Sequence, residues 1–296
     1  DVENGIVWEI AQWFPAVAVY DDVHGWNTLP YVGTGEFYNN YGNYELNITV
    51  PRDHLVVASG ELQNADIVFT KTQQERLQQA KKSSETVMIR SKDEVTDPES
   101  RPKGDGPLTW RFKAENVRTV AFAASAAFIL DATSTTDGKT LVQSAYPKEA
   151  LPAWGKSTQM LRTSIEGYSR RWFHYPYPVA TNVGGIEGGM EYPMIIFCQG
   201  RGNNERGLYG VTTHEIGHNW FPMLVNTDER RHAWMDEGFN TFINKYSTAD
   251  WFENAREAKP STFAGMMRMP GVPIMTAADR LNGMQLGLLQ YAKTGT

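Results

Sequence analysis

The sequence predicts an α+β fold in which a β-rich first half precedes a more helical second half. Short segments that alternate apolar and polar residues lie before residue 148, and this period of two is typical of strands with one buried face. Longer segments with helical periodicity lie after it. We therefore expect an N-terminal antiparallel β domain over 1–148 and a second domain over 149–296.

Three segments of the first half have the character of antiparallel strands. They cover 44–50, 86–90 and 108–112; the first and third place apolar residues at alternate positions, and the second is a short run rich in β-branched residues. One helix is expected between the first two, because Thr72 and Glu75 have the spacing of a capping box. These segments account for the β-rich character of the N-terminal domain.

The second half is expected to combine helices with a short strand. We expect a helix over 151–173, a glycine-rich segment over 184–189, a strand over 194–198 and a helix over 211–224. A further helix is expected after Glu237, with Phe239, Phe242 and Ile243 directed inward.

The composition is that of an ordinary globular protein, with 41% hydrophobic and 21% charged residues. A formal net charge of -6 argues against nucleic acid as the main partner, because a nucleic-acid-binding surface is basic. No apolar run approaches the roughly 20 residues that a membrane-spanning helix needs. Cys198 is the single cysteine, so no disulfide can form within the chain and no thiolate cluster can hold a metal.

The most informative motif is His214-Glu215-Ile216-Gly217-His218, followed by Glu237 after 18 intervening residues. On an α-helix, positions i and i+4 lie about 40° apart around the axis and about 6 Å apart along it, so both imidazoles can reach one ion. Two histidines and one carboxylate leave the fourth position of a tetrahedral zinc ion free for water. We therefore expect one Zn²⁺ per chain, bound by His214, His218 and Glu237.

Glu215 has the position of a general base. It follows the first histidine, so the same helix face brings its carboxylate beside the expected zinc-bound water. Zinc lowers the pKa of such a water to about 7, and Glu215 then need only remove one proton and deliver it to the leaving amine. The alternative is an ordinary helix on which two histidines happen to lie four positions apart.

In three motifs the chain resembles the aminopeptidase N and leukotriene hydrolase family of gluzincin metallopeptidases. The motifs cover 188–191, 214–221 and 234–239, and the segment 11–22 is similar to part of the family's N-terminal domain. The resemblance implies a thermolysin-like zinc peptidase domain over 149–296 that is incomplete at its C-terminus. It also implies an N-terminal domain without its first strands, which makes the remainder of a longer chain a candidate partner.

The resemblance further implies roles for residues outside the metal site. Glu191 would bind the free α-amino group of a peptide, and Gly188, Gly189 and Met190 would belong to an edge strand that pairs with the substrate backbone. Tyr291, in a sequence similar to the family's Tyr-x-Lys-Gly, would donate its hydroxyl to the oxyanion. Independently of the family, a carboxylate near the metal selects a protonated amine by a charge-assisted hydrogen bond.

Three positions depart from the family pattern. Tyr192 and Asp236 each replace a typical asparagine, and Asp236 would either orient a histidine or cap a helix. Phe14 stands where many members have a second Glu or Gln near the amine. Amine binding would therefore depend on Glu191 with help from Gln12.

The leading hypothesis is a zinc-dependent aminopeptidase that removes the N-terminal residue of a peptide through a metal-activated water. Its substrates would be peptides with a free N-terminus. One alternative is a zinc endopeptidase with the same metal site, in which Glu191 binds no amine. The others are a catalytically inactive binding module derived from the family and an epoxide-opening hydrolase that uses the same zinc.

Overall fold

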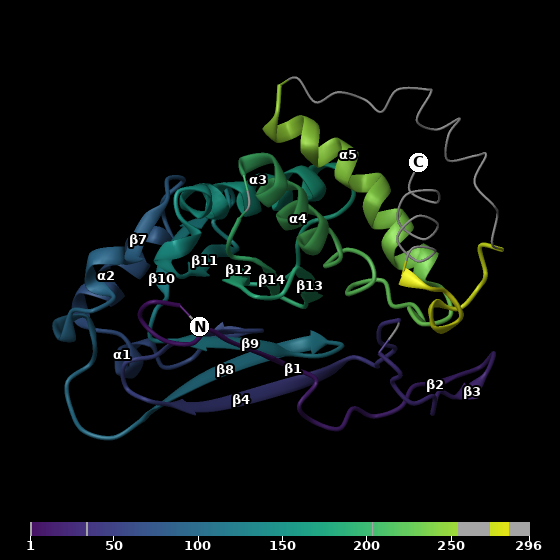
Figure 1. The fold of residues 1–296 in the computed structure, drawn as a ribbon, viewed down its shortest axis with the longest axis horizontal. Coiled ribbons are helices and arrows are strands. Elements are labelled where there is room, and N and C mark those ends of the chain that lie inside the picture. Colours follow the sequence, from purple (N-terminus) through teal and green to yellow (C-terminus); the bar gives the residue numbers. More distant parts are fainter. Residues whose placement is uncertain (1, 34, 203, 254–272, 284–296) are drawn as a thin grey trace.

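Stacked β-sheets covered by helices make up the structure, a computed structural model that describes residues 2–33, 35–202, 204–253 and 273–283 (Figure 1). Two antiparallel three-stranded sheets form the first layer, and a six-stranded mixed sheet lies above them. Helices α3 (Ser157–Arg171) and α4 (Glu205–Gly217) pack on the six-stranded sheet, and α5 (Phe239–Trp251) packs on both helices. The predicted α+β class, with β structure before the helices, is confirmed.

The first layer contains most strands of the N-terminal part. Its sheets have the orders β4-β8-β6 and β1-β9-β5, and β2 and β3 form a separate pair. The bounds are β1 Trp8–Ala11, β2 Tyr20–Asp21, β3 Gly25–Trp26, β4 Gly42–Val50, β5 Leu55–Ala58, β6 Glu61–Leu62, β8 Leu108–Val117 and β9 Ala121–Ser125. The strands predicted over 44–50 and 108–112 are confirmed as parts of β4 and β8, whose side chains alternate between interior and solvent as the period of two requires.

The second layer is the sheet β13-β14-β12-β11-β10-β7. Its strands are β7 Val87–Arg90, β10 Ile129–Ser134, β11 Leu141–Tyr146, β12 Val179–Gly185, β13 Gly189–Tyr192 and β14 Ile195–Gln199. Strands β11, β12 and β14 run parallel, and the other pairs are antiparallel. The strands predicted over 86–90 and 194–198 are confirmed. The first of them pairs with β10 in this sheet and not with β4 or β8, because the composition of a strand does not specify its partner strand.

The six-stranded sheet takes strands from both sides of residue 148. That residue lies between β11 and β12, which are adjacent strands of the sheet. The chain contributes β7 to the six-stranded sheet, returns to the first layer for β8 and β9, and re-enters the six-stranded sheet at β10. The domain division at 148 stays a prediction, but it does not separate two sheets.

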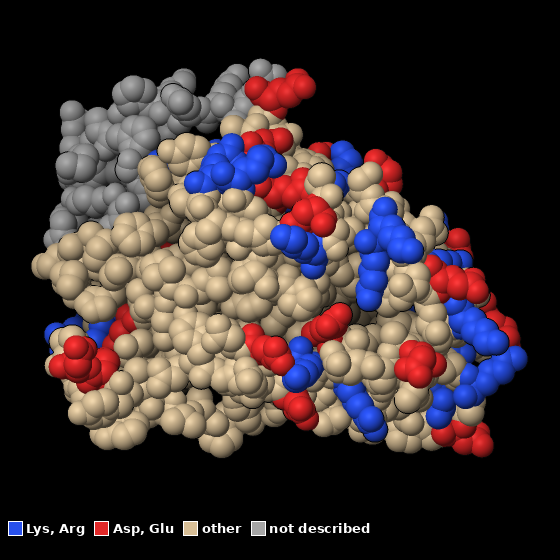
Figure 2. Space-filling view, turned by 180° about the vertical axis from the view of Figure 1, so that it is seen from behind, with Lys and Arg blue, Asp and Glu red and all other residues tan. Residues whose placement is uncertain are grey.

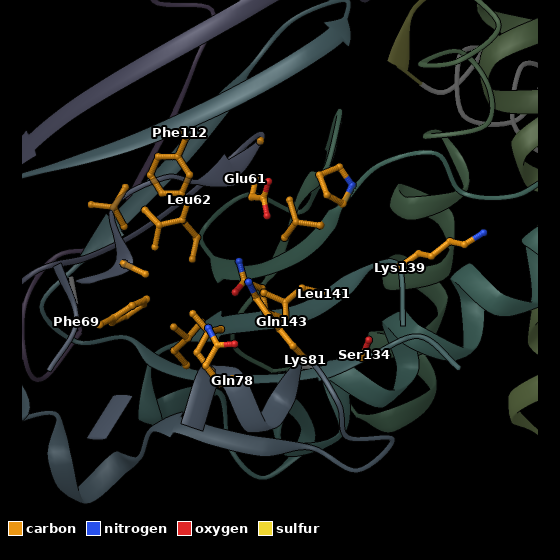
Figure 3. A pocket seen from close by; sticks show the side chains of 18 of the residues that line it. Glu61, Leu62, Phe69, Gln78, Lys81, Phe112, Ser134, Lys139, Leu141 and Gln143 are labelled. Carbon is orange, nitrogen blue, oxygen red and sulfur yellow. The ribbon is translucent and has the colours of Figure 1, made fainter. Parts of the chain in front are cut away.

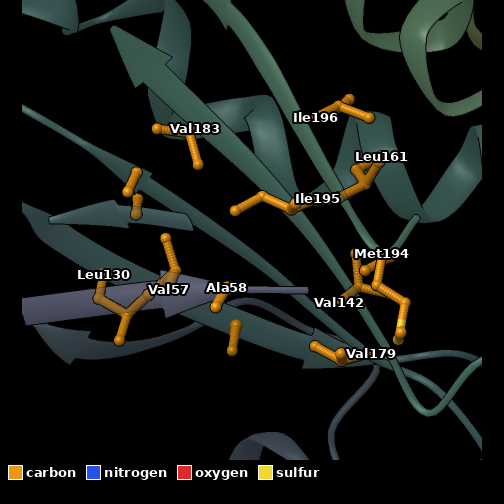
Figure 4. Close-up of a cluster of buried hydrophobic side chains, with 14 of the residues drawn as sticks. Val57, Ala58, Leu130, Val142, Leu161, Val179, Val183, Met194, Ile195 and Ile196 are labelled. Carbon is orange, nitrogen blue, oxygen red and sulfur yellow. The ribbon is translucent and has the colours of Figure 1, made fainter. Parts of the chain in front are cut away.

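One continuous hydrophobic core joins the layers. Side chains from β5, the six-stranded sheet and α3 gather in a single buried cluster (Figure 4). Val57, Leu130, Val142, Leu161 and Ile195 are among its members, and each is at most 2% exposed. Burial of a side chain of this size contributes about 1.5–3 kcal/mol, so the core holds the strand ends around the candidate site in place.

Helix α2 (Lys71–Ala80), which follows the single turn α1 (Ala65–Val68), begins two residues earlier than the capping-box prediction. The box is formed by Thr70 and Gln73, not by Thr72 and Glu75: the Thr70 hydroxyl accepts from the Gln73 amide at 3.3 Å. Two possible capping boxes overlap in this sequence. The earlier helix start places Gln73, Leu77 and Ala80 on the buried face of α2.

In the described part of the chain, five short 3-10 turns connect the main elements. They cover Lys92–Glu94, Pro98–Ser100, Lys148–Ala150, Ala153–Lys156 and Ala278–Arg280. Two of them precede α3, so the helix predicted over 151–173 begins only at Ser157.

Helix α4 begins earlier and ends earlier than the predicted 211–224. The side chain of Asn204 caps its start by accepting from the Gly207 amide at 2.9 Å. The helix ends at Gly217, and His218 caps it with helical dihedral angles. Pro222 contributes to this end, because proline has no amide hydrogen and disfavours a helical conformation at the residue before it.

A π-helical turn at Trp234–Gly238 leads into α5. The predicted inward direction is correct for Ile243, which packs against the core, but wrong for Phe239 and Phe242, which are each 44% exposed. The inner face of α5 is polar and includes the buried Asn240. A pattern that places apolar residues inward therefore selects the wrong face of a helix that supports a polar site.

Candidate active site

Helix α4 and the π-helical turn bring the three predicted metal ligands together. The Nε2 atoms of His214 and His218 lie 3.3 Å apart. The Oε2 atom of Glu237 lies 3.1 Å from Nε2 of His214 and 3.4 Å from Nε2 of His218. The three donor atoms therefore form a nearly equilateral triangle.

This triangle has the size that a tetrahedral zinc ion requires. An ion about 2.0–2.1 Å from each donor has its donors about 3.3–3.4 Å apart. Two neutral imidazole nitrogens and one carboxylate oxygen are also the donor set of many catalytic zinc sites. His214, His218 and Glu237 therefore fit the metal that the sequence predicts.

The outer ring nitrogens of both histidines have hydrogen-bond partners. Nδ1 of His214 lies 2.9 Å from Oδ1 of Asn244 on α5. Nδ1 of His218 lies 2.9 Å from Oδ1 of Asp236 and 3.2 Å from the carbonyl oxygen of Phe221. Such contacts fix the ring orientation and direct Nε2 toward the metal. Of the two roles considered for Asp236, the structure favours the orientation of a histidine.

Glu215 points its carboxylate toward strand β13. A Cβ atom on Gly189 would lie 2.2 Å from Oε1 of Glu215, so only glycine leaves room for this carboxylate. The carboxylates of Glu215 and Glu191 and a ring nitrogen of His218 all lie within 4.8 Å of one another. Burial raises the pKa of Glu215 to about 7, which suits a group that must accept and return a proton near neutral pH.

Glu191 lies on β13, at the edge of the six-stranded sheet. Within the described ranges β13 pairs with β14 alone, so its other backbone edge, along Gly189 and Met190, is open to an extended peptide. The Glu191 side chain is buried, and its Oε1 has no hydrogen-bond partner in the described part of the chain. Burial, followed by the neighbouring Glu36 carboxylate, raises the pKa of Glu191 well above its ordinary value. A cation bound beside Glu191 would favour the charged carboxylate again and would take up the free acceptor oxygen.

Sequence reasoning missed Glu36, which the structure places beside Glu191. Oxygen atoms of Glu36, Glu191, Glu229 and Asp236 all lie within 4.8 Å of one another. In this group Asp236 contacts a histidine, and Glu229 pairs with Arg118 at 2.5 Å. Oε2 of Glu36 is buried and, in the described part of the chain, has no hydrogen-bond partner. Glu36 and Glu191 are therefore the two carboxylates of the group that these contacts leave free for a ligand.

Gln12, Gly188 and Tyr291 complete the set of predicted site residues. The side-chain amide of Gln12 contacts the hydroxyl of Tyr192, with distances of 2.9 and 3.2 Å to its nitrogen and oxygen. Its side-chain hydrogen bonds in the described ranges are to Tyr192 and not to Glu191. Tyr291 lies outside the described residues, so its role stays a prediction. Gly188 precedes β13 and has open space where a side chain would stand.

A separate cavity of about 240 Å³ lies between α2, β6 and the six-stranded sheet (Figure 3). Leu62, Phe69 and Phe112 line one side of it, and Lys139 stands toward the other. None of the metal-site residues lines this cavity. The chemistry of the candidate site therefore does not extend into it.

On the face shown in Figure 2, acidic and basic side chains are interspersed, and no large area is basic alone. None of the helices in the described ranges has the length and apolar character that a bilayer crossing requires.

The arrangement of two histidines, one carboxylate as the third ligand and a buried glutamate beside an edge strand defines a metallopeptidase-like site. Residues 192–283 match the family model of the Peptidase family M1 domain, and this segment contains His214, Glu215, His218 and Glu237. The resemblance inferred from the sequence motifs is thereby confirmed.

Solved structures of M1 zinc metallopeptidase from Deinococcus radiodurans have a similar fold. One structure matches with a TM-score of 0.53 and 16% identity over 84% of this chain and 50% of its own. A point mutant matches with a TM-score of 0.56 and 16% identity over 87% and 52%. The same mutant bound to a Tyr-Ser-Ala substrate matches with a TM-score of 0.55 and 17% identity over 87% and 51%. The present chain thus spans about half the length of these structures.

Proposed function

We propose that this chain carries the catalytic centre of a zinc-dependent aminopeptidase, which hydrolyses the first peptide bond of a substrate with a free N-terminus. The observation that supports it most is the pair of carboxylate oxygens of Glu191 and Glu36 that have no hydrogen-bond partner among the described residues, close to the triangle of metal donors. A metal triangle alone fits any zinc hydrolase. Carboxylates that require a cation next to it favour a substrate with an amino group at the cleavage end.

His214, His218 and Glu237 would hold the zinc ion. When bound, zinc supplies a Lewis acid that activates water and polarises the scissile carbonyl. Asn244 and Asp236 keep the histidine rings oriented through their Nδ1 atoms. The metal site would thus be assembled entirely from α4, the π-helical turn and α5.

Glu215 would move the proton. Its buried carboxylate, with a pKa raised to about 7, can take a proton at neutral pH and return it to the leaving amine. Gly189 leaves the space in which the carboxylate stands. Tyr291 is proposed, from the family resemblance alone, to donate its hydroxyl to the oxyanion.

Glu191 and Glu36 would bind the substrate's ammonium group, and the open edge of β13 would pair with its backbone. Burial of two carboxylates without a cationic partner is unfavourable. A bound ammonium group would form charge-assisted hydrogen bonds with both and would remove this penalty. A peptide without a free amine leaves these carboxylates unpaired, so it should bind much less well. In this scheme Gln12 supports Tyr192 and does not touch the amine.

A matched pair of peptides tests the proposal. One has a free N-terminus and the other is its N-acetylated twin, and both are incubated with the zinc-loaded protein. We expect cleavage of the first bond of the free peptide and a kcat/KM at least about 100-fold lower for the twin, because a site built for a polar partner rejects analogues that lack it. Equal cleavage of both would support a zinc endopeptidase instead.

A zinc-loaded chain that cleaves neither peptide would support an inactive binding module. Loss of activity on chelation and its return with zinc would attribute the reaction to the metal site. The Glu191→Gln variant, which keeps the size of the side chain, should reduce the preference for the free amine while retaining the metal.

A further inference from the structure

Strand β13 is held in place by a residue of the N-terminal sheet. Glu9 lies on β1, where it pairs with Ala123 of β9, and its side chain reaches the loop between β12 and β13. Its Oε2 atom accepts from the backbone amides of Ile186 at 3.0 Å and Glu187 at 3.1 Å. Two successive amides that converge on one carboxylate form a charge-assisted contact to the backbone.

Two glycines show how tightly this loop fits. A Cβ atom on Gly185 would lie 2.1 Å from Cδ and Oε1 of Glu9, so the carboxylate occupies the space of a side chain there. At the other end of the loop, a Cβ atom on Gly189 would lie 2.2 Å from Oε1 of Glu215. The loop therefore runs between two carboxylates, one from the N-terminal sheet and one from α4.

We propose that Glu9 is a positioning residue that sets the place of strand β13 relative to Glu215. Through Ile186 and Glu187 it fixes the loop, and through the loop it keeps Gly189 against the Glu215 carboxylate and Glu191 beside Glu36. This inference rests on the proposed function for its effect on catalysis, but the contact itself is independent of the reaction.

A pair of variants of similar size separates hydrogen bonding from packing. Glu9→Gln keeps an oxygen that can accept from the amides, whereas Glu9→Met fills a similar volume and accepts no amide hydrogen. We expect Glu9→Met to lower kcat/KM on the free-amine peptide by about 10- to 100-fold, since misplacement by 1 Å can cost about 100-fold. Glu9→Gln should stay within about threefold of the wild type. Glu187→Gln, which removes a charge from the same loop, is the control.

Kinetic constants and zinc content distinguish positioning from a loss of folded protein. A smaller folded fraction lowers the apparent kcat and leaves KM unchanged, whereas a displaced β13 raises KM and lowers kcat together. Bound zinc should remain at the wild-type level in Glu9→Met, because none of the three metal donors contacts Glu9 in the described part of the chain. Equal kinetic constants for Glu9→Met and Glu9→Gln would overturn the proposal.

The close contact between Gly185 and the Glu9 carboxylate gives an independent double-mutant test. In the wild-type protein, Gly185→Ala should lower kcat/KM, because the added Cβ collides with the Glu9 carboxylate. In the Glu9→Ala background, where that space is empty, the same substitution should lower kcat/KM little further. If the effects of Gly185→Ala and Glu9→Ala on kcat/KM are additive, the proposed contact between the two residues is contradicted.

Amide hydrogen exchange in the 183–192 segment tests the anchoring role of Glu9 even if no peptide is cleaved. Failure of the proposed function can therefore be distinguished from failure of this inference. Exchange should be faster in Glu9→Met than in Glu9→Gln and Glu187→Gln. Should Glu9→Met not fold, Gly185→Ala should show the same faster exchange. Unchanged exchange in the variants that fold would refute the anchoring role.

Discussion

Asp131 on β10 gives a prediction that can be worked out from the structure. The side chain is completely buried, and its carboxylate accepts from the hydroxyls of Tyr146, at 2.6 Å, and Thr158. None of its hydrogen-bond partners in the described part of the chain carries a positive charge. Burial therefore raises its pKa from 3.8 to about 6, although the two hydroxyls oppose the rise.

The sign of the effect on stability follows from linkage. The folded state holds the Asp131 proton to higher pH than the unfolded state does, so protonation favours folding. This contribution is fully present below about pH 4 and is lost as the pH rises through about 6. A difference of about two pKa units corresponds to about 3 kcal/mol, as an order of magnitude.

Substitution of Asp131 by asparagine removes this titration. We expect the free energy of unfolding of Asp131→Asn, minus that of the wild type, to rise by up to about 3 kcal/mol between about pH 4 and pH 7. Urea denaturation of both proteins across this range measures the difference, and other titrating groups cancel in it. A flat difference profile, or one that falls with pH, would refute the assignment of a raised pKa to this carboxyl.

Three further predictions concern the candidate site. Glu215→Gln should retain zinc by elemental analysis but lower kcat by about 100- to 10,000-fold, the usual contribution of a general base. Asp236→Asn should weaken zinc binding by about 10- to 100-fold in a chelator competition, because Asp236 orients His218. Arg118→Met should lower the free energy of unfolding by about 3–5 kcal/mol in urea, because it leaves the carboxylate of Glu229 buried without its partner.

Each of these predictions has an outcome that contradicts it. Full turnover in Glu215→Gln would remove Glu215 from the reaction. Unchanged zinc affinity in Asp236→Asn would mean that the Phe221 carbonyl alone orients the ring. The double variant Arg118→Met with Glu229→Gln should recover part of the lost stability, and no recovery would show that packing of the arginine dominates.

The metal site was accessible to sequence analysis because its geometry is local. His214 and Glu215 lie on α4 and His218 is its C-cap with helical dihedral angles, so the helical period fixes their relative directions before anything is known of the fold. Glu237 was found by its spacing to that helix. The three donors meet as predicted, although α4 ends at Gly217 and not at 224.

The rest of the site depends on long-range packing, which leaves no periodic signal. Glu36 reaches Glu191 only because the Arg118–Glu229 pair, together with the Phe37 amide that donates to Glu229, holds its segment against the catalytic part. Glu9 reaches the loop before β13 through the pairing of β1 with β9. In the sequence, neither Glu36 nor Glu9 belongs to a motif that predicts such a contact.

The polar inner face of α5 was missed for a related reason. Periodicity identifies the apolar face of a helix as the buried one. Here Asn240 donates to the carbonyl oxygen of His214, and Asn244 contacts its ring, so the requirements of the site override the usual pattern.

The shared six-stranded sheet has a practical consequence for cutting the chain in two. A break near residue 148 would expose one edge of β11 on the first fragment and one edge of β12 on the second. These strands pair in parallel from Leu141 opposite Val179 to Ala145 opposite Val183, so the fragments would have complementary edges. Separately expressed halves should reassemble or precipitate and not behave as independent units, and their complementation would restore both the sheet and the candidate metal site at once.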